Sequence, residues 1–191
     1  MKNIKVLLII AIVIAVLIGM SIGNYNSLVG MNEEVKTALS QIDNQLQRRN
    51  DLIPNLVETV KQYAAQEEEI FIGVSEARAK LAGATTIAEQ AEGDAELNSA
   101  LSRLLAISEN YPELKSNQNF IQLQDELAGT ENRISVARKD YNDAAKVYNK
   151  KVRSFPMVIF AGMFGFEQAE YFEASEAART NPNVGDLFDE E

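Results

Sequence analysis

The segment from Val35 to Leu81 reads VKTALSQIDNQLQRRNDLIPNLVETVKQYAAQEEEIFIGVSEARAKL, and the spacing of its apolar residues decides the fold class. Apolar side chains recur at alternating steps of four and three residues, the period of helices that pack along a common seam. At 1.5 Å per residue this period predicts one helix of about 70 Å. Twelve of the fourteen seam residues are apolar, and the seam consists of Val35, Leu39, Ile42, Leu46, Arg49, Ile53, Leu56, Val60, Tyr63, Glu67, Ile70, Val74, Ala77 and Leu81.

Arg49 and Glu67 are the two polar seam residues. We expect both to lie at the edge of the seam, with their stems packed and their charges solvated. The alternative is a buried polar contact that fixes the register of the helices. Pro54 lies in the same segment, and we expect it to kink the helix, because the apolar period continues through it unchanged. The alternative is a break, with Asp51 capping a new helix.

A second long helix is expected from Ser116–Asn117 to the residue before Pro156. Ser and Asn are favoured N-cap residues, and Pro favours termination of a helix. Near its end, Val152 can take the seam position in place of Lys151. The predicted seam residues of this helix are Phe120, Leu123, Leu127, Thr130, Ile134, Ala137, Tyr141, Ala144, Tyr148, Lys151 and Phe155.

A third helix is expected between these two, from about Thr86 to Tyr111. No segment shows the alternating pattern of a β-strand. Helices joined by short loops pack antiparallel, so residues 24–172 are predicted to form a bundle of three to four long helices. The stripe of the third helix is Leu97, Leu101, Leu104, Ser108 and Tyr111.

The first 23 residues form the predicted membrane anchor. Val6 to Ile22 reads VLLIIAIVIAVLIGMSI and carries no charge, which is close to the shortest helix that crosses a hydrocarbon core about 30 Å thick. A cleaved signal peptide is the competing interpretation, but the apolar region of a signal peptide spans only about 7–15 residues. We therefore expect an all-α protein with a retained, single-pass transmembrane helix that contacts the lipid bilayer through residues 4–22.

Charge is divided unevenly around the anchor. Lys2 and Lys5 precede it, whereas the other 16 of the 18 basic residues and all 28 acidic residues follow it. Such an acidic domain disfavours binding to nucleic acid. Because positive residues favour the cytoplasmic side, the bundle is predicted to be extracytoplasmic.

Several stretches resemble the LemA family, in order along most of the chain. One departure is Leu39, which stands where many family members have Trp, and this chain contains no Trp. The stretches are YNSLV (25–29), SQID (40–43), QLQRRNDLIPNLV (45–57), ENYPELK (109–115), TENRI (130–134) and ARKDYN (137–142), followed by Phe155-Pro156, Ala161, Gly165-Phe166 and Tyr171-Phe172.

The resemblance implies an N-terminal membrane helix and a helical bundle in a bacterial envelope, without a defined biochemical activity. It also implies a different sidedness, because the family has been proposed to place a short N-terminus outside and the large domain in the cytoplasm. A cytoplasmic bundle is therefore the alternative to the charge-based prediction.

The segment from Ser154 to Phe166, SFPMVIFAGMFGF, contains no charged residue. Thirteen residues are too few to cross a bilayer as a helix. We expect the segment to cap the bundle or to form a subunit interface, because a three-helix bundle would end far from the bilayer; contact with the membrane interface is the alternative. The candidate interaction residues in and beside it are Phe155, Pro156, Phe160, Gly162, Phe164, Gly165 and Phe166.

The sequence lacks the residues on which common catalytic and metal chemistry depends. It has no Cys and no His, which removes thiol chemistry and the commonest general base and metal ligand. It also has no phosphate-binding glycine motif. We therefore expect a non-enzymatic protein without a catalytic, cofactor or metal site. The acidic tail, residues 173–191, is expected to be disordered.

Together these features predict a membrane-anchored scaffold or adaptor of the bacterial cell envelope. The long seams and the uncharged segment near the C-terminus favour a homo-oligomer and a protein partner that the sequence does not specify. An accessory subunit of a membrane enzyme and a ligand-sensing domain are the alternatives, and the enzyme subunit would require a concave site with convergent polar groups.

Overall fold

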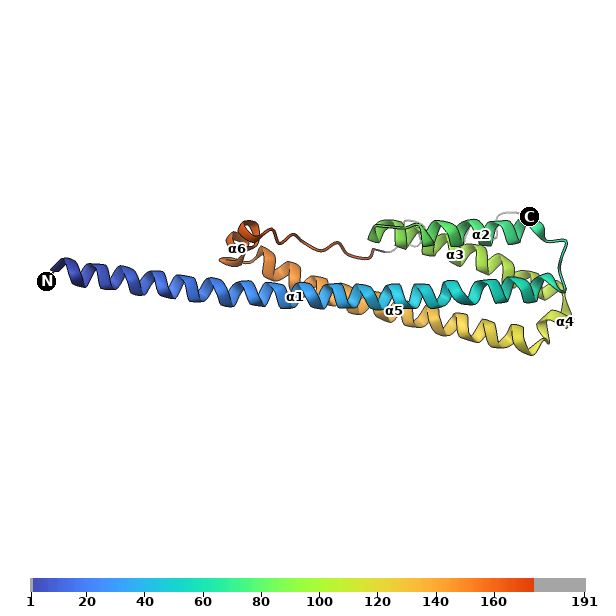
Figure 1. Ribbon diagram of the computed structural model, residues 1–191. Helices are drawn as coiled ribbons and strands as arrows, with labels where there is room; N and C mark the ends of the chain where they lie inside the picture. Colours follow the sequence, from blue (N-terminus) through green and yellow to red (C-terminus); the bar gives the residue numbers. More distant parts are fainter. Residues whose placement is uncertain (1, 174–191) are drawn as a thin grey trace, which may run out of the picture. The chain divides into compact units, whose positions relative to one another are not determined.

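The computed structural model describes residues 2–173, and all regular structure in that range is helical (Figure 1). This confirms the predicted all-α fold. Apart from Glu173, the predicted disordered tail lies outside the described residues. The elements are α1 (Lys2–Lys61), α2 (Glu68–Ala82), α3 (Ile87–Ile107), the 3-10 helix η1 (Ser108–Asn110), α4 (Pro112–Lys115), α5 (Gln118–Arg153) and α6 (Met157–Phe164).

The chain divides into two compact units. Unit 1 comprises Met1–Asn44 and Ile134–Tyr171, and unit 2 comprises Gln45–Arg133 and Phe172–Glu191. Helices α1 and α5 therefore contribute residues to both units. The sequence-based boundaries, which separate an anchor, a bundle and a tail, stay predictions.

The prediction of a single helix from Val35 to Leu81 is wrong, because α1 ends at Lys61 and the chain turns before α2. Residues 62–67 contain neither Gly nor Pro, so no strong turn signal marks this position. The apolar period survives the turn because seam residues on both helices face a buried core. The buried seam residues of unit 2 are Leu46, Arg49, Ile53, Leu56 and Val60 on α1, and Val74, Ala77 and Leu81 on α2.

Side-chain contacts show that α2 runs antiparallel to α1 within unit 2. Arg78 Nε donates a hydrogen bond to Asn50 Oδ1 at 2.7 Å. Further along α1, Lys61 Nζ lies 5.2 Å from the ring centre of Phe71. As α1 advances, its partners on α2 therefore come from earlier positions, which defines an antiparallel pair.

Helix α5 is also antiparallel to α1 in unit 2. Arg48 pairs with Glu126 at 2.9 Å, whereas Tyr63 Oη accepts a hydrogen bond from Asn117 Nδ2 at 2.9 Å. The first contact joins α1 to the interior of α5, whereas the second joins a residue just after α1 to the residue just before α5, so the two helices run in opposite directions. Unit 2 thus joins segments of α1, α2, α3 and α5, the upper end of the predicted range of three to four helices.

The N-termini of α3 and α5 are set by the residues that the sequence indicated. Thr86 Oγ1 accepts a hydrogen bond from the Glu89 N–H at 3.1 Å, and Glu89 accepts one from the Thr86 N–H, which forms a capping box. The Thr85 and Thr86 donors hold the pKa of Glu89 below its ordinary value. Asn117 Oδ1 accepts from the N–H groups of Asn119 and Phe120, which confirms the predicted cap of α5.

The core of unit 1 lies between α1, the second half of α5 and α6. Val152 is 6% exposed and occupies the seam position near the end of α5, as predicted. Phe155 is 83% exposed, so its assignment to the seam is wrong. The reason is that α5 ends at Arg153 and the chain turns into α6. The buried apolar residues of unit 1 are Leu28, Val35, Ile42, Ile134, Ala137, Tyr141, Ala145, Tyr148, Val152, Met157 and Ala161.

Helix α1 continues through Pro54. The alternative of a new helix capped by Asp51 is therefore wrong, and the size of the kink stays a prediction. Pro54 is exposed, so the carbonyl group that loses its helical hydrogen bond can be solvated by water.

Gly93 allows α3 to approach the backbone of α2. A Cβ atom at Gly93 would lie 2.9 Å from the Cα of Leu81, closer than packed atoms tolerate. We expect Gly93→Ala to lower the free energy of unfolding by about 1–3 kcal/mol, although alanine is favoured in a helix by about 1 kcal/mol. Thermal unfolding of the full chain in detergent micelles, followed by far-ultraviolet circular dichroism, measures the change.

Gly73 is the matched control, because it lies inside α2 and a Cβ atom there would meet nothing within 4 Å. Gly73→Ala should raise the free energy of unfolding by up to about 1 kcal/mol through helix propensity alone. Equal shifts in the two variants would contradict the close packing of α2 and α3.

Candidate functional site

The candidate residues from the sequence fall into two separate groups. Arg49, Pro54 and Glu67 belong to unit 2, and the remaining candidates belong to unit 1. The structure brings Arg49 into a buried ionic cluster. The second group consists of the residues in and beside α6, namely Phe155, Pro156, Phe160, Gly162, Phe164, Gly165 and Phe166.

Arg49 is buried in the core of unit 2 and joins three helices through its guanidinium group. Its Nη1 atom donates to Asp94 Oδ1 on α3 at 2.8 Å and to Glu131 Oε2 on α5 at 2.7 Å. Its Nη2 atom donates to Asn98 Oδ1. The side chains of Arg49 and Asp94 are 4% and 1% exposed, whereas that of Glu131 is 45% exposed. The expectation of a solvated charge is wrong for Arg49, and the alternative of a buried polar contact is confirmed.

The partners of Arg49 were missed, although the sequence contains a signal for one of them. Asp94 lies three residues before Leu97, so it extends the apolar stripe of α3 toward its N-terminus. A charged side chain on the buried stripe of one helix predicts an opposite charge on the stripe of another, because an unpaired buried charge is strongly unfavourable. Glu131 gives no such signal, because it stands one position after the seam residue Thr130 and is half exposed.

Glu67 lies in the turn between α1 and α2, outside the cluster of Arg49. Its Oε1 atom accepts a weak hydrogen bond from Tyr111 Oη at 3.4 Å. Gln66 Nε2 also donates to Tyr111 Oη, at 2.5 Å. Burial raises the pKa of Tyr111, and the nearby Glu67 carboxylate raises it further. These contacts tie the turn to the residue between η1 and α4.

Helix α6 packs on the part of α1 that follows its N-terminal apolar stretch. The rings of Phe164 and Phe166 meet the ring of Tyr25 edge-on, with centroid distances of 5.0 and 5.7 Å. Gly165 ends the helix with φ of +73°, the left-handed conformation that favours glycine. A three-helix bundle would have ended far from the predicted anchor, and this expectation is wrong, because the reversal after Lys61 adds a helix and α6 lies beside Tyr25. Whether the segment contacts lipid or protein stays a prediction.

The chain after α6 is held against α5 by buried side chains. The amide group of Asn149 donates to the carbonyl of Ala169 and accepts from the N–H of the same residue, both at 2.8 Å. Tyr141 Oη donates to the carbonyl of Glu170 at 2.8 Å, and burial raises the pKa of Tyr141. These hydrogen bonds bind the segment after α6 to α5 and so hold α6 in place.

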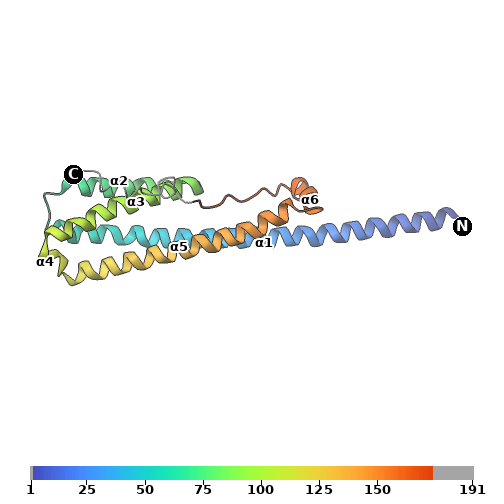
Figure 2. The same cartoon turned by 180° about the vertical axis from the view of Figure 1, so that it is seen from behind.

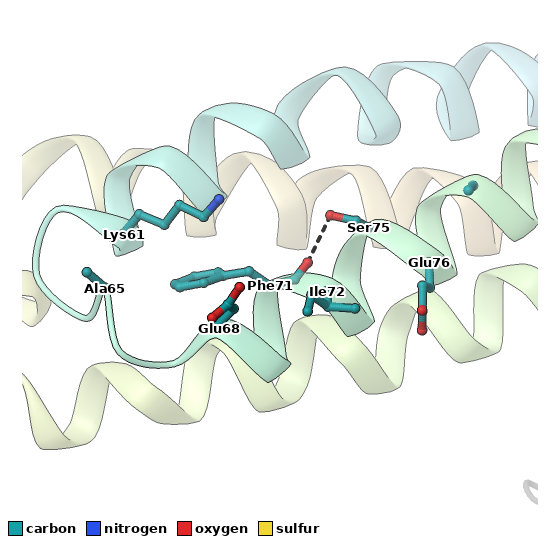
Figure 3. A pocket seen from close by; sticks show the side chains of 8 residues that line it. Lys61, Ala65, Glu68, Phe71, Ile72, Ser75 and Glu76 are labelled. Atoms are coloured by element: carbon teal, nitrogen blue, oxygen red, sulfur yellow. Dashed lines mark hydrogen bonds between the residues drawn. The ribbon is translucent and has the colours of Figure 1, made fainter.

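A depression of about 570 Å³ lies between the end of α1 and α2 (Figure 3). Lys61 stands over the Phe71 ring, and Ser75 Oγ donates to the Phe71 carbonyl at 2.8 Å. The depression is open. Among residues 2–173, no group of His, Cys, Asp and Glu could hold a metal ion. The residues that line the depression are Lys61, Ala65, Glu68, Phe71, Ile72, Ser75, Glu76 and Ala79.

The cluster of Arg49 predicts a large cost for removing one partner. In Arg49→Met the buried Asp94 carboxylate loses the guanidinium group with which it forms an ion pair, and we expect the free energy of unfolding to fall by about 3–5 kcal/mol. The double variant Arg49→Met, Asp94→Leu should recover most of that loss, because apolar side chains replace a desolvated ion pair. Denaturant unfolding of the full chain in micelles measures both changes.

Arg48 provides the control at the adjacent position. Its ion pair with Glu126 is exposed, with side-chain exposures of 54% and 46%, and such pairs contribute about 0–1 kcal/mol. Arg48→Met should therefore cost less than about 1 kcal/mol. A similar decrease in the free energy of unfolding for Arg48→Met and Arg49→Met would contradict the prediction that the buried ion pair is more costly to break than the exposed one.

Comparison with known proteins confirms the resemblance seen in the sequence. A family model described as "LemA family" matches residues 38–185. "Magnetosome protein MamQ 2" of Paramagnetospirillum magneticum is 31% identical over 192 residues, covering 87% of this chain and 71% of the relative. "Magnetosome protein MamQ" of Magnetospirillum gryphiswaldense is 29% identical with the same coverage. "Protein LemA" of Metamycoplasma hominis is 24% identical over 167 residues, covering 87% of this chain and 76% of the relative. With a family match that spans well over half of its length, this chain belongs to the LemA family.

Proposed function

We propose that this protein is a membrane-anchored helical scaffold or adaptor of the bacterial cell envelope. The observation that carries the proposal is the continuity of α1. This one helix contains an exposed apolar stretch as far as Ile22 and buried core residues from Leu28 onward. The anchor and the packed part of unit 1 therefore share a single rod without a flexible linker.

The apolar stretch of α1 has the properties of a membrane span. The helix contains an 18-residue window with a mean hydropathy of 2.6, and none of that window is buried by the rest of the protein. Leu7, Ile14 and Ile22 are each at least half exposed, at 65%, 50% and 58%. In water such a surface would be strongly unfavourable, so a bilayer is the environment that fits it.

The interior of the bundle supports a structural role over an enzymatic one. The polar groups of Arg49, Asp94 and Asn98 are used to pair with one another. The depression beside Lys61 is open, and the hydroxyl group of Ser75 in its lining is used in a hydrogen bond to a backbone carbonyl. A scaffold requires a stable fold and an accessible surface, which a helical bundle can supply.

Self-association is part of this proposal, and α1 offers a surface for it. Small residues recur every four positions, at Ala11, Ala15 and Gly19 within the apolar stretch and at Gly23 directly after it. A Cβ atom at Gly19 or Gly23 would meet nothing within 4 Å. Stripes of small residues allow close packing of transmembrane helices, so a second copy of α1 fits this face.

The stripe leads to a test of self-association in membranes. We expect the unaltered protein, crosslinked in intact membranes, to give a species larger than one protomer, and Gly19→Ile to reduce its yield by at least about tenfold, as a loss of about 1.4 kcal/mol would. Gly30→Ile is the control, because Gly30 is equally open on the same helix but lies beyond the apolar stretch. A mass of one protomer over a wide concentration range would contradict self-association. The crosslinked species also supply the protein partner for identification by mass spectrometry.

We further propose that the bundle is extracytoplasmic, because Lys2 and Lys5 precede the span. The chain has no Cys, so Ser135→Cys introduces a unique thiol at an exposed position of α5. A membrane-impermeant maleimide should label this thiol in intact spheroplasts. Labelling only after lysis would place the bundle in the cytoplasm and contradict the charge-based prediction.

A further inference from the structure

Helix α6 exposes an apolar surface that no described residue covers. Phe155, just before the helix, is 83% exposed, and Met163 near its end is 67% exposed. Val158 and Ile159 between them are 48% and 57% exposed. A surface helix of a soluble protein carries polar residues on its outer face, whereas a helix that is apolar all round is buried in protein or lipid.

The position of α6 relative to the apolar stretch of α1 indicates what covers this surface. Its inner face is packed, with Met157 and Ala161 buried and Phe164 and Phe166 against Tyr25. Tyr25 lies three residues after Ile22, which is a rise of about 5 Å. Figures 1 and 2 both draw α6 beside α1. Helix α6 therefore lies at the level where the span leaves the hydrocarbon core and where aromatic residues favour the membrane interface.

Basic residues stand directly before α6. The last turn of α5 contains Lys150, Lys151 and Arg153, in a chain with a net charge of −10. Cations at this position also interact favourably with the helix dipole of α5. Beside the end of a membrane span, however, they have a second partner, because lipid phosphates lie at the same depth.

We propose that α6 is an interfacial membrane helix whose outer face enters the bilayer that α1 spans, while the basic turn of α5 binds the phosphate groups of anionic lipids. The outer face consists of Phe155, Val158, Ile159 and Met163. The inference rests on the proposed function in one respect, the insertion of α1. Continuity of this surface with the span identifies lipid as its occupant.

Two points of membrane contact would restrain unit 1 more than a single helix can. A lone transmembrane helix can tilt and rotate about its own axis in the bilayer. Contact through α6 fixes that rotation, because α6 covers only the side of α1 that carries Tyr25. The segment after α6 is bound to Tyr141 and Asn149 of α5 through Glu170 and Ala169, and this keeps α6 on that side. The remaining faces of unit 1 would then be presented to partners in a fixed orientation.

Fluorescence of single tryptophans tests the proposal, since the chain contains no native Trp. The full chain is reconstituted in vesicles of phosphatidylcholine and phosphatidylglycerol with lipids that carry a quencher near the headgroup. In Ile159→Trp we expect blue-shifted emission and at least about twofold quenching, because interfacial helices bury their apolar face about 5–10 Å deep. Val136→Trp is the control, since Val136 is an equally exposed residue of unit 1, about 25 Å from the end of α5. It should show water-like emission and no quenching.

A second variant tests the basic turn. In the Ile159→Trp background, quenching should increase as phosphatidylglycerol replaces phosphatidylcholine. Neutralisation by Lys150→Gln, Lys151→Gln and Arg153→Gln should abolish this increase, while the chain keeps its helical circular dichroism. An unchanged dependence on phosphatidylglycerol would overturn the role assigned to the basic turn.

Flotation with the vesicles after carbonate washing distinguishes failure of the proposed membrane anchor from failure of the inference about α6. A chain that fails to float lacks an inserted anchor, and the proposed function fails. If the Ile159→Trp variant floats while its tryptophan emits as in water, the inference about α6 alone is overturned. Blue-shifted emission without lipid quenching also overturns it, because the apolar face would then be covered by protein, such as a second copy.

Discussion

The apolar stripe of α1 cannot be covered by α1 itself, and the other helices are arranged to bury it. Within unit 2, α2 and α5 run against α1, while in unit 1 the second half of α5 and α6 lie along it. Helices α2 and α5 are amphipathic at a period near 3.5, so each can give one face to the core and one to water. Helix α6 differs, because it contains only apolar residues and glycine. The first third of α1 has no such neighbour in the described chain. The same physical requirement, removal of apolar surface from water, is met by other helices from Leu28 onward. For the apolar stretch before it, the proposed function assigns this role to lipid.

The charged cluster in unit 2 adds specificity to this non-directional packing. Hydrophobic burial alone tolerates sliding of one helix along another by a turn, because apolar residues recur on every turn. Arg49 does not tolerate it, since its guanidinium group must meet Asp94 on α3 and Glu131 on α5 at once. A shift of one turn would leave a buried charge unpaired, which costs several kcal/mol. We infer that the cluster sets the register of three helices, at little net gain in stability.

Much of the fold could be predicted from the sequence because the period and the caps are local signals. The start of α3 at Thr86 and the start of α5 after Asn117 follow from side chains that bond to nearby N–H groups. The apolar stretch at the start of α1 follows from composition. The turn after Lys61 could not be predicted, because a straight helix and a reversal at that point place the same seam residues in the core. Only long-range contacts, such as Tyr63 with Asn117, distinguish the two.

The sequence by itself determined that the chain is helical, that its first 23 residues are apolar enough for lipid, and that it resembles the LemA family. The tertiary structure decided where Arg49 finds its counter-charges and where α6 lies. Both depend on the reversal of the chain, which brings residues from 45 to 141 positions apart into contact. The period of a helix reports which residues are buried, but it carries no information on which helix buries them. That choice is made by close packing and charge pairing in three dimensions.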